Sequence, residues 1–337
     1  MANIFLTRKC NLKCPYCFAD EFVNKANEEI SIENFKKAYN FIKTEKGERL
    51  GLIGGEPTLH PHFDDFLDII LEDKDIERCI VYTNGLELDK HINKITNPKL
   101  HFLINCNPPS DLGKMYDKLK SNIKLASENK VDFNLGINLY SDKMDYSFIF
   151  ELLKIADIHY LRFSTALPNS DKEQTVNALE SFAQFKPFLF RFFQDCLEKD
   201  IVPYNDCNSI PVCLLDVEDK RLQIKLFQLS QKYNCRDTIL TTQGCAPVVD
   251  ILPDLNAVRC FGLSKYTKVN INEFANFNNL RKYFINTIDL YAKLAFEKED
   301  CQDCKLRMLD KCGLCYTYKL KNMQTLKKYT RERTQHS

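Results

Sequence analysis

The stretch Cys10-Asn11-Leu12-Lys13-Cys14-Pro15-Tyr16-Cys17 decides the fold of this chain, with three cysteines at the spacing C-x3-C-x2-C. Three thiolates in one loop can hold a metal centre, but they are one ligand short of a closed site. A four-iron cluster held by three cysteines leaves one iron without a protein ligand. A small molecule can bind that iron and be reduced there, so we expect a reactive centre.

A second motif, Gly54-Gly55-Glu56-Pro57, follows the triplet. The two glycines allow the backbone to approach a ligand closely, and Glu56 with its neighbouring carbonyls offers acceptors for an ammonium group. Together the motifs resemble the radical S-adenosylmethionine (SAM) enzymes. Taken singly, each motif has a plainer reading. The triplet alone is compatible with stray cysteines or an incomplete zinc knuckle, and the tetrapeptide alone with a surface β-turn.

The resemblance implies a 4Fe-4S cluster on Cys10, Cys14 and Cys17, whose free iron takes the amino and carboxylate groups of SAM. Electron transfer from a donor such as flavodoxin or ferredoxin then cleaves SAM to methionine and a 5′-deoxyadenosyl radical, which abstracts hydrogen from the substrate. The resemblance also implies that Tyr16 lies by the adenine. The SAM amino group is expected to contact Gly54, Gly55, Glu56 and Pro57.

The composition is that of an ordinary globular protein, with 44% hydrophobic and 28% charged residues among 337. A formal net charge of +1 argues against a nucleic-acid partner, which requires a strong basic excess. The chain has no apolar run long enough to span a membrane, and its start lacks a signal-peptide pattern. We therefore expect a cytoplasmic protein with no membrane partner.

Short apolar runs alternate with helical patterns over the first 200 residues. We expect strands at residues 2–7, 51–53, 79–82, 100–104, 133–139 and 160–163. Helices are expected at 35–42 behind a Ser31 cap, and at 62–71, 115–128, 148–156 and 174–197, the last broken near Pro187. Six strand–helix repeats indicate an α/β fold with parallel strands, and the resemblance implies a partial (β/α)6 TIM-like barrel. Function then belongs at the C-terminal ends of the strands.

Three further polar residues stand at expected strand ends. The resemblance implies ribose or carboxylate contacts to SAM from Asn105, Asn138 and Arg162. Many relatives carry Ser-x-Asp-Gly after the fourth strand, whereas this chain has Asn105-Cys106-Asn107-Pro108-Pro109. An arginine at a strand end is as often a structural ion pair as a ligand, so both readings stay open for Arg162.

Fifteen cysteines are many for such a protein, and nine of them lie beyond residue 200. In a reducing compartment they indicate metal ligands rather than disulfides. The segment from Cys245 to Cys260 resembles the hairpin of the SPASM and twitch extensions behind some radical SAM barrels, where two cysteines bind an auxiliary 4Fe-4S cluster. Leu255 stands where that hairpin usually has glycine, so we expect a different turn.

Eight cysteines are candidate ligands of one or two auxiliary clusters: Cys207, Cys213, Cys245, Cys260, Cys301, Cys304, Cys312 and Cys315. The simplest division gives the first four to one cluster and the last four to another, but relatives exchange ligands between sites, so the pairing stays open. A zinc site on the last four is the alternative, since paired C-x2-C knuckles also bind zinc. We thus divide the chain into a barrel (1–200), a C-terminal cysteine-rich auxiliary-cluster domain (201–318) and a basic tail (319–337).

The resemblance implies a peptide or protein substrate, because barrels with SPASM-type extensions mostly act on peptides. We expect a ribosomally made precursor that receives a cross-link or a dehydrogenated residue, with auxiliary clusters accepting the electron left after hydrogen abstraction. Cys106, at the expected barrel mouth, is a candidate hydrogen donor, as in some radical SAM peptide epimerases. Alternatives are dehydrogenation of a small metabolite, or a non-catalytic iron–sulfur carrier.

Overall fold

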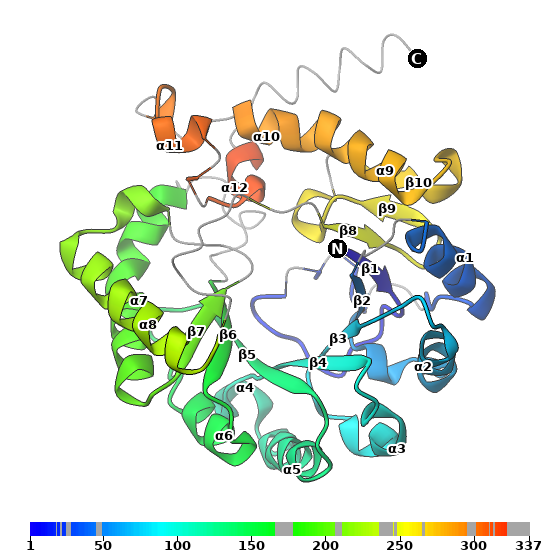
Figure 1. Ribbon diagram of the computed structural model, residues 1–337, viewed down its shortest axis with the longest axis horizontal. Coiled ribbons are helices and arrows are strands. Elements are labelled where there is room, and N and C mark those ends of the chain that lie inside the picture. The colour runs from blue at the N-terminus through cyan, green and yellow to red at the C-terminus, as the bar shows by residue number, and fades with distance from the viewer. Residues whose placement is uncertain are drawn as a thin grey trace.

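The computed structural model describes residues 1–17, 19–20, 22–24, 28–44, 49–165, 178–205, 211–235, 245, 248–264, 267–294, 301–309, 311–312 and 314–321. One continuous sheet organises these residues. Its strand order is β10-β9-β8-β1-β2-β3-β4-β5-β6-β7, and it curves into an open barrel with helices around the outside (Figure 1).

Seven strands run parallel in sequence order: β1 (Ala2–Phe5), β2 (Leu50–Ile53), β3 (Cys79–Thr83), β4 (Leu100–Asn105), β5 (Phe133–Leu139), β6 (Tyr160–Thr165) and β7 (Val202–Asn205). All four residues of β1 and of β2 are buried, as expected for parallel strands covered on both faces. The α/β fold and the six strands expected from the apolar runs are therefore confirmed.

The helices that connect these strands pack on the outer face of the sheet: α1 (Ile32–Ile42), α2 (Phe63–Glu72), α3 (Ile92–Ile95), α4 (Pro109–Leu112), α5 (Met115–Glu128), α6 (Phe148–Ala156) and α7 (Ala178–Glu198). The expected cap of the first helix is present, since the Ser31 side chain accepts a hydrogen bond from the amide of Asn34. The longer helices bury an apolar stripe; in α2 the stripe is Phe63, Phe66, Leu67 and Ile70.

The predicted break at Pro187 is wrong, because α7 continues through this residue. A proline inside a helix costs about 3 kcal/mol. Phe182, Phe185, Phe188 and Phe192 are all buried on this helix, and each contributes roughly 1.5–3 kcal/mol of apolar burial. The packed aromatic face therefore outweighs the lost backbone hydrogen bond.

The sheet continues past residue 200 into the cysteine-rich region. β8 (Val249–Ile251) pairs in parallel with β1, and β9 (Asn256–Val258) and β10 (Val269–Asn270) extend that edge as antiparallel strands. The division at residue 200 therefore stays a prediction, since the sheet runs across it. In the β8–β9 turn, Leu255 has a φ of 65°, the left-handed backbone that favours glycine, and its side chain is buried.

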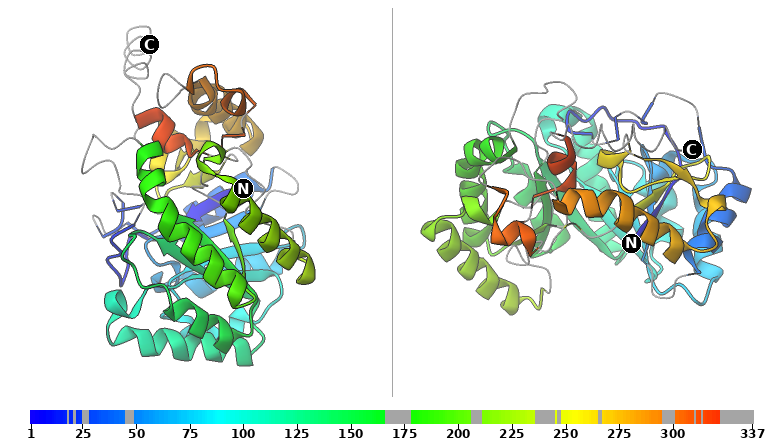
Figure 2. Two further views of the ribbon diagram at one scale, coloured as in Figure 1. Left: turned by 90° about the vertical axis from the view of Figure 1, so that its left-hand side faces the viewer. Right: turned by 90° about the horizontal axis from the view of Figure 1, so that it is seen from above.

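The remaining helices of this region are α8 (Val217–Lys232), α9 (Phe277–Phe284), α10 (Leu290–Leu294), α11 (Lys305–Met308) and α12 (Tyr316–Lys321), together with short 3-10 turns η3 (Val212–Leu214) and η4 (Phe261–Leu263). A π-helical segment, η6 (Ile285–Asp289), joins α9 to α10. Seen from above, α9 and α10 lie over the β8–β10 edge of the sheet (Figure 2). No helix in the described part of the chain is long and apolar enough to cross a membrane. The predicted tail from residue 322 onward lies outside the described residues.

Candidate functional site

The C-terminal edge of the parallel sheet gathers the motifs found in the sequence. The cysteine triplet follows β1, the Gly54–Pro57 turn follows β2, and Asn84 follows β3. Asn105 ends β4 and Asn138 is the last residue but one of β5, while Arg162 lies in the middle of β6, opposite Gly136. Because neighbouring parallel strands end at one edge, residues far apart in the sequence form one polar surface there.

The cysteine loop is fastened directly to the glycine turn. The amide of Gly55 donates to the carbonyl of Thr7 at 2.7 Å, and the amide of Glu56 donates to the carbonyl of Lys9 at 2.8 Å. From the other side, the Asn24 side chain accepts from the amide of Cys10 at 3.0 Å. Asn24 has a φ of 55°, a conformation that asparagine tolerates better than most residues. These contacts hold the start of the triplet in place.

The three thiols of the triplet are partly buried. Burial raises the pKa of all three, and that of Cys10 rises to about 12. Two sulfurs accept hydrogen bonds that favour the thiolate form: Cys10 Sγ from the amide of Leu12, and Cys14 Sγ from Asn107 Nδ2, both at 3.4 Å. Half-buried sulfurs with donors aimed at them suit an iron–sulfur cluster. Among the described residues no three Cys, His, Asp or Glu side chains converge on a single-ion site. A cluster spreads its cysteines over separate irons, so it does not need that convergence.

Glu56 is buried and fully engaged by the protein. Its Oε1 accepts from Thr58 Oγ1 and Thr83 Oγ1, both at 2.7 Å, and its Oε2 accepts from the amide of Asn84 at 2.7 Å. Burial raises the pKa of this carboxyl, and the surrounding donors oppose that shift. The side chain therefore ties the end of β2 to the end of β3, and the prediction that it contacts SAM stays untested.

Replacing Glu56 with alanine is expected to destabilise the protein by about 2–4 kcal/mol, because the buried hydroxyls of Thr58 and Thr83 lose their acceptor at about 1–3 kcal/mol each. The shift of the urea unfolding midpoint under anaerobic conditions measures this. Glu33→Ala is the matched control, since Glu33 is exposed on α1 and pairs only with Lys37 at the surface. Equal midpoints for the two variants would contradict the role given to Glu56.

Tyr16 links the triplet to the ends of β4 and β5. Its hydroxyl donates to Asn107 Oδ1, and its ring stacks on Tyr140 with 5.3 Å between ring centres. Burial and the nearby Cys14 thiol raise the pKa of Tyr16, and a hydrogen bond with Asn138 lowers it. The sequence analysis missed Asn107 and Tyr140. The signal for Asn107 was its place in the segment that replaces Ser-x-Asp-Gly, at the end of an expected strand.

Asn105, Asn138 and Arg162 lie together around Gly136. A Cβ at Gly136 would stand 3.1 Å from Asn105 Oδ1 and 3.3 Å from Arg162 Cδ, so glycine leaves room for both side chains. Arg162 donates to Asn138 Oδ1 at 3.1 Å. Asn105 Oδ1 is buried and receives no hydrogen bond from the described part of the protein, which makes it an acceptor available to a ligand.

Cys106 does not fit the role of a hydrogen donor. Its side chain is 1% exposed and lies in the apolar core, and its thiol donates toward the carbonyl of Ile104 at 3.5 Å. Burial raises its pKa far above that of a free thiol. Cys79 and Cys196 are also core residues.

Cys245 and Cys260, the cysteines of the β8–β9 hairpin, have Cys315 as a neighbour. Cys245 and Cys260 flank β8 and β9, and burial raises the pKa of both thiols, with Cys315 close enough to raise them further. Arg259, buried between them, donates to Cys245 Sγ at 3.5 Å and pairs with Asp289 at 2.7 Å. This neighbourhood favours a division other than the simplest one, and the pairing stays a prediction. Cys207 lies outside the described residues.

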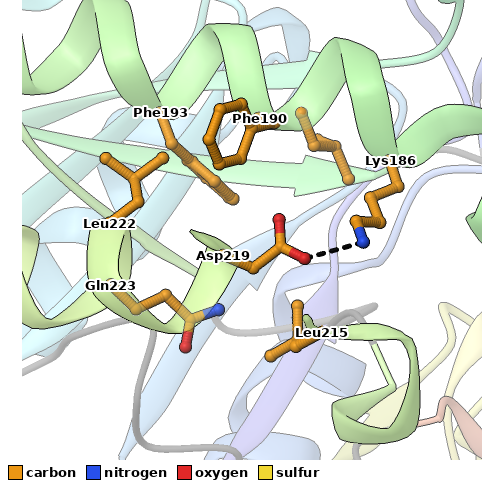
Figure 3. Close-up of a pocket in the computed structure, with 8 residues that line it drawn as sticks. Lys186, Phe190, Phe193, Leu215, Asp219, Leu222 and Gln223 are labelled. Carbon is orange, nitrogen blue, oxygen red and sulfur yellow. Dashed lines mark ion pairs between the residues drawn. The ribbon is translucent and has the colours of Figure 1, made fainter. Parts of the chain in front are cut away.

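A pocket elsewhere in the molecule is structural. It lies between α7 and α8 and is lined by Phe190, Phe193 and Leu222 with the polar residues Lys186, Asp219 and Gln223 (Figure 3). Lys186 pairs with Asp216 at 2.7 Å and with Asp219 at 2.8 Å, and these two aspartates form the capping box of α8. None of the predicted site residues lines this pocket.

A known protein family matches the part of the chain that carries the cysteine triplet and the glycine turn. Residues 4–140, which contain the cysteine triplet and the glycine turn, match the Radical SAM superfamily. The chain therefore carries a radical SAM domain, and its cofactors are a 4Fe-4S cluster and SAM.

Curated relatives match shorter stretches of the chain. GTP 3′,8-cyclase of Photorhabdus laumondii is 32% identical over 96 residues, covering 27% of this chain and 28% of that protein. The antilisterial bacteriocin subtilosin biosynthesis protein AlbA of Bacillus subtilis is 25% identical over 154 residues, covering 42% and 34%. The chain thus spans about a third or less of each relative's length.

Solved structures are similar over most of the chain. SuiB of Streptococcus suis, bound to the precursor peptide SuiA, has a TM-score of 0.62 at 15% identity, over 94% of this chain and 71% of that one. anSMEcpe, with bound AdoMet and the Cp18Cys peptide, has a TM-score of 0.63 at 16% identity, over 99% and 98%. At these identities the likeness establishes a shared fold, including the region beyond the barrel.

Proposed function

We propose that this protein is a radical SAM enzyme that modifies a peptide, a ribosomally made precursor in which it forms a cross-link or a dehydrogenated residue. The observation that carries the proposal is the extent of the fold likeness. The two solved structures with bound peptides match 94% and 99% of the chain, whereas the GTP cyclase relative matches 27%. A match of 96 residues is too short to cover both the barrel and the cysteine-rich region beyond it.

The protein's own residues prepare the site in three ways. Gly55 and Glu56 fix the start of the triplet through backbone hydrogen bonds, so the three thiolates keep one geometry. Asn107 donates to Cys14 and stabilises its thiolate. Asn105, Asn138 and Arg162 form a polar wall beside Tyr16, with one buried acceptor unused by the described residues.

A cluster and SAM bound there would supply a hydrogen-abstracting radical when an electron arrives from flavodoxin or ferredoxin. The site lies at the carboxyl edge of the sheet, and Tyr16, Tyr140 and Asn107 pack beside the triplet. Tyr16, Tyr140 and Asn107 limit the access of water and orient a substrate C–H bond beside the bound SAM.

The test is anaerobic turnover with dithionite, SAM and a synthetic peptide encoded beside the gene. We expect 5′-deoxyadenosine, together with a peptide lighter by a pair of hydrogen atoms. The Cys10, Cys14 and Cys17 triple alanine variant is the negative control and should form neither product. Conversion of GTP, or of a small alcohol, without any change to the peptide would refute the peptide assignment and leave the radical SAM domain intact.

A further inference from the structure

Cys213 lies beside three C-terminal cysteines from which the β8–β10 segment separates it in the sequence. The amide of Val212 donates to the carbonyl of Cys312 at 3.4 Å, which brings the two backbones together. Partial desolvation raises the pKa of the Cys213 thiol, and the thiols of Cys312, Cys301 and Cys304 raise it further. The amide of Lys311 donates to the carbonyl of Leu306 at 2.7 Å, which in turn holds Cys312 beside the helix that follows Cys304. These backbone contacts bring the segments of Cys213, Cys304 and Cys312 together.

The cysteines of the C-x2-C turn are held rigidly. The amide of Cys304 donates to the carbonyl of Cys301 at 3.3 Å. Arg307 Nε donates to the same carbonyl at 2.9 Å, and Arg307 Nη1 reaches the carbonyls of Lys293 and Leu294, each at 3.0 Å. This arginine fastens the turn to the C-terminal end of α10.

The segment that carries Cys213 is anchored from the other side. Leu215, two residues on, lines the pocket between α7 and α8 (Figure 3). Asp216 caps α8 and pairs with Lys186. Cys213 itself is exposed in the η3 turn. Both halves of the cysteine group therefore rest on well-packed structure.

Close packing of α12 against η4 places Cys315 near the hairpin cysteines, Cys245 and Cys260. A Cβ at Gly262 would stand 2.5 Å from Thr317 Oγ1, so the glycine lets α12 lie directly against η4. That packing places Cys315, just before α12, near Cys260, just before η4. The two groups of cysteines are thus built by different contacts.

We propose that Cys213, Cys301, Cys304 and Cys312 together hold one auxiliary 4Fe-4S cluster, while Cys315 joins Cys245 and Cys260 at a second one. Four thiolates complete the cluster and leave no iron open, so this site transfers electrons and does not bind substrate. The assignment rests on the proposed function only in that the region carries auxiliary clusters.

The experiment compares Cys213→Ala, Cys304→Ala, Cys315→Ala and Cys235→Ala, each in the otherwise unchanged chain and in the triple alanine background that lacks the SAM cluster. Cys235 is the matched control, since it is not one of the eight candidate ligands and it lies close enough to Tyr160 of β6 to influence that side chain. Iron, acid-labile sulfide and zinc are measured, and the reduced proteins are compared by electron paramagnetic resonance.

We expect about eight irons in the background, at four for each cluster. Cys213→Ala and Cys304→Ala should change one and the same resonance signal, Cys315→Ala the other, and Cys235→Ala neither. The proposal is overturned if Cys213→Ala behaves like Cys235→Ala, if Cys213 and Cys315 change the same signal, or if zinc replaces iron. These readouts use no substrate, so they stand even if the peptide assignment fails.

Discussion

Replacing Asp289 with alanine is expected to lower the free energy of unfolding by about 3–5 kcal/mol, because the guanidinium of Arg259 stays buried without its carboxylate. The side chains of Arg259 and Asp289 are 0% and 4% exposed, and Nε donates to Oδ1 at 2.7 Å. The pair joins the β8–β9 hairpin to the π-helical segment η6. The shift of the denaturation midpoint of the full chain under anaerobic conditions measures the loss.

Two variants separate the ion pair from a general effect of substitution. Glu218→Ala removes an exposed partner of Arg221, with both side chains about two-thirds exposed, and should cost no more than about 0.5 kcal/mol. The double variant Arg259→Met with Asp289→Leu removes both charges and should recover much of the loss, since apolar replacement of a buried pair is often neutral. If Asp289→Ala costs no more than Glu218→Ala, the pair does not stabilise this domain.

Besides its ion pair with Asp289, Arg259 contacts residues around the hairpin cysteines. Its Nη2 donates to Cys245 Sγ at 3.5 Å, and its guanidinium lies 6.0 Å from the centre of the Tyr316 ring, next to Cys315. The buried cation opposes the effect of burial on Cys245 and Cys260, because it lowers the pKa of both thiols and so favours their thiolate form. The stability of the hairpin and the environment of the auxiliary cysteines therefore depend on one side chain.

The barrel could be predicted because its strands and helices have recognisable local sequence patterns. Apolar runs such as 133–139 and capped helical patterns such as the one behind Ser31 need no information from elsewhere in the chain. Pro187 shows the limit of this reasoning, since a local rule for helix breaking gave way to the burial of four phenylalanines that only the tertiary structure reveals.

The site could be predicted only as far as its motifs. The triplet and the glycine turn have readable spacing, but the contacts of Asn24 and Asn107 with the cysteines depend on how loops meet at the sheet edge. The pairing of the C-terminal cysteines could not be predicted either, because it depends on which distant segments come together in the fold. Order along the chain placed Cys213 with Cys245, whereas folding places it with Cys312.

Replacing Gly55 with alanine is expected to reduce SAM cleavage by about 100-fold or more, because a displaced site loses orientation steeply. A Cβ at Gly55 would stand 2.3 Å from the carbonyl oxygen of Lys9 and 2.9 Å from that of Arg8, both backbone atoms that cannot swing aside. The chain before Cys10 must then move, and the hydrogen bond from the amide of Glu56 to Lys9 is lost with it.

Reductive formation of 5′-deoxyadenosine, together with iron per chain, measures this effect. The three atoms nearest to a Cβ at Gly55 belong to Lys9 and Arg8, beside the cysteine triplet, so iron should fall by about four per chain at most. Gly113→Ala is the control, since a Cβ there meets no atom within 4 Å and its backbone, at a φ of 52° and a ψ of −128°, adds strain of about 1–3 kcal/mol without touching the triplet. Wild-type cleavage by Gly55→Ala would mean that the loop of Cys10 does not depend on its backbone contact with the glycine turn. Loss in both variants would instead indicate general unfolding.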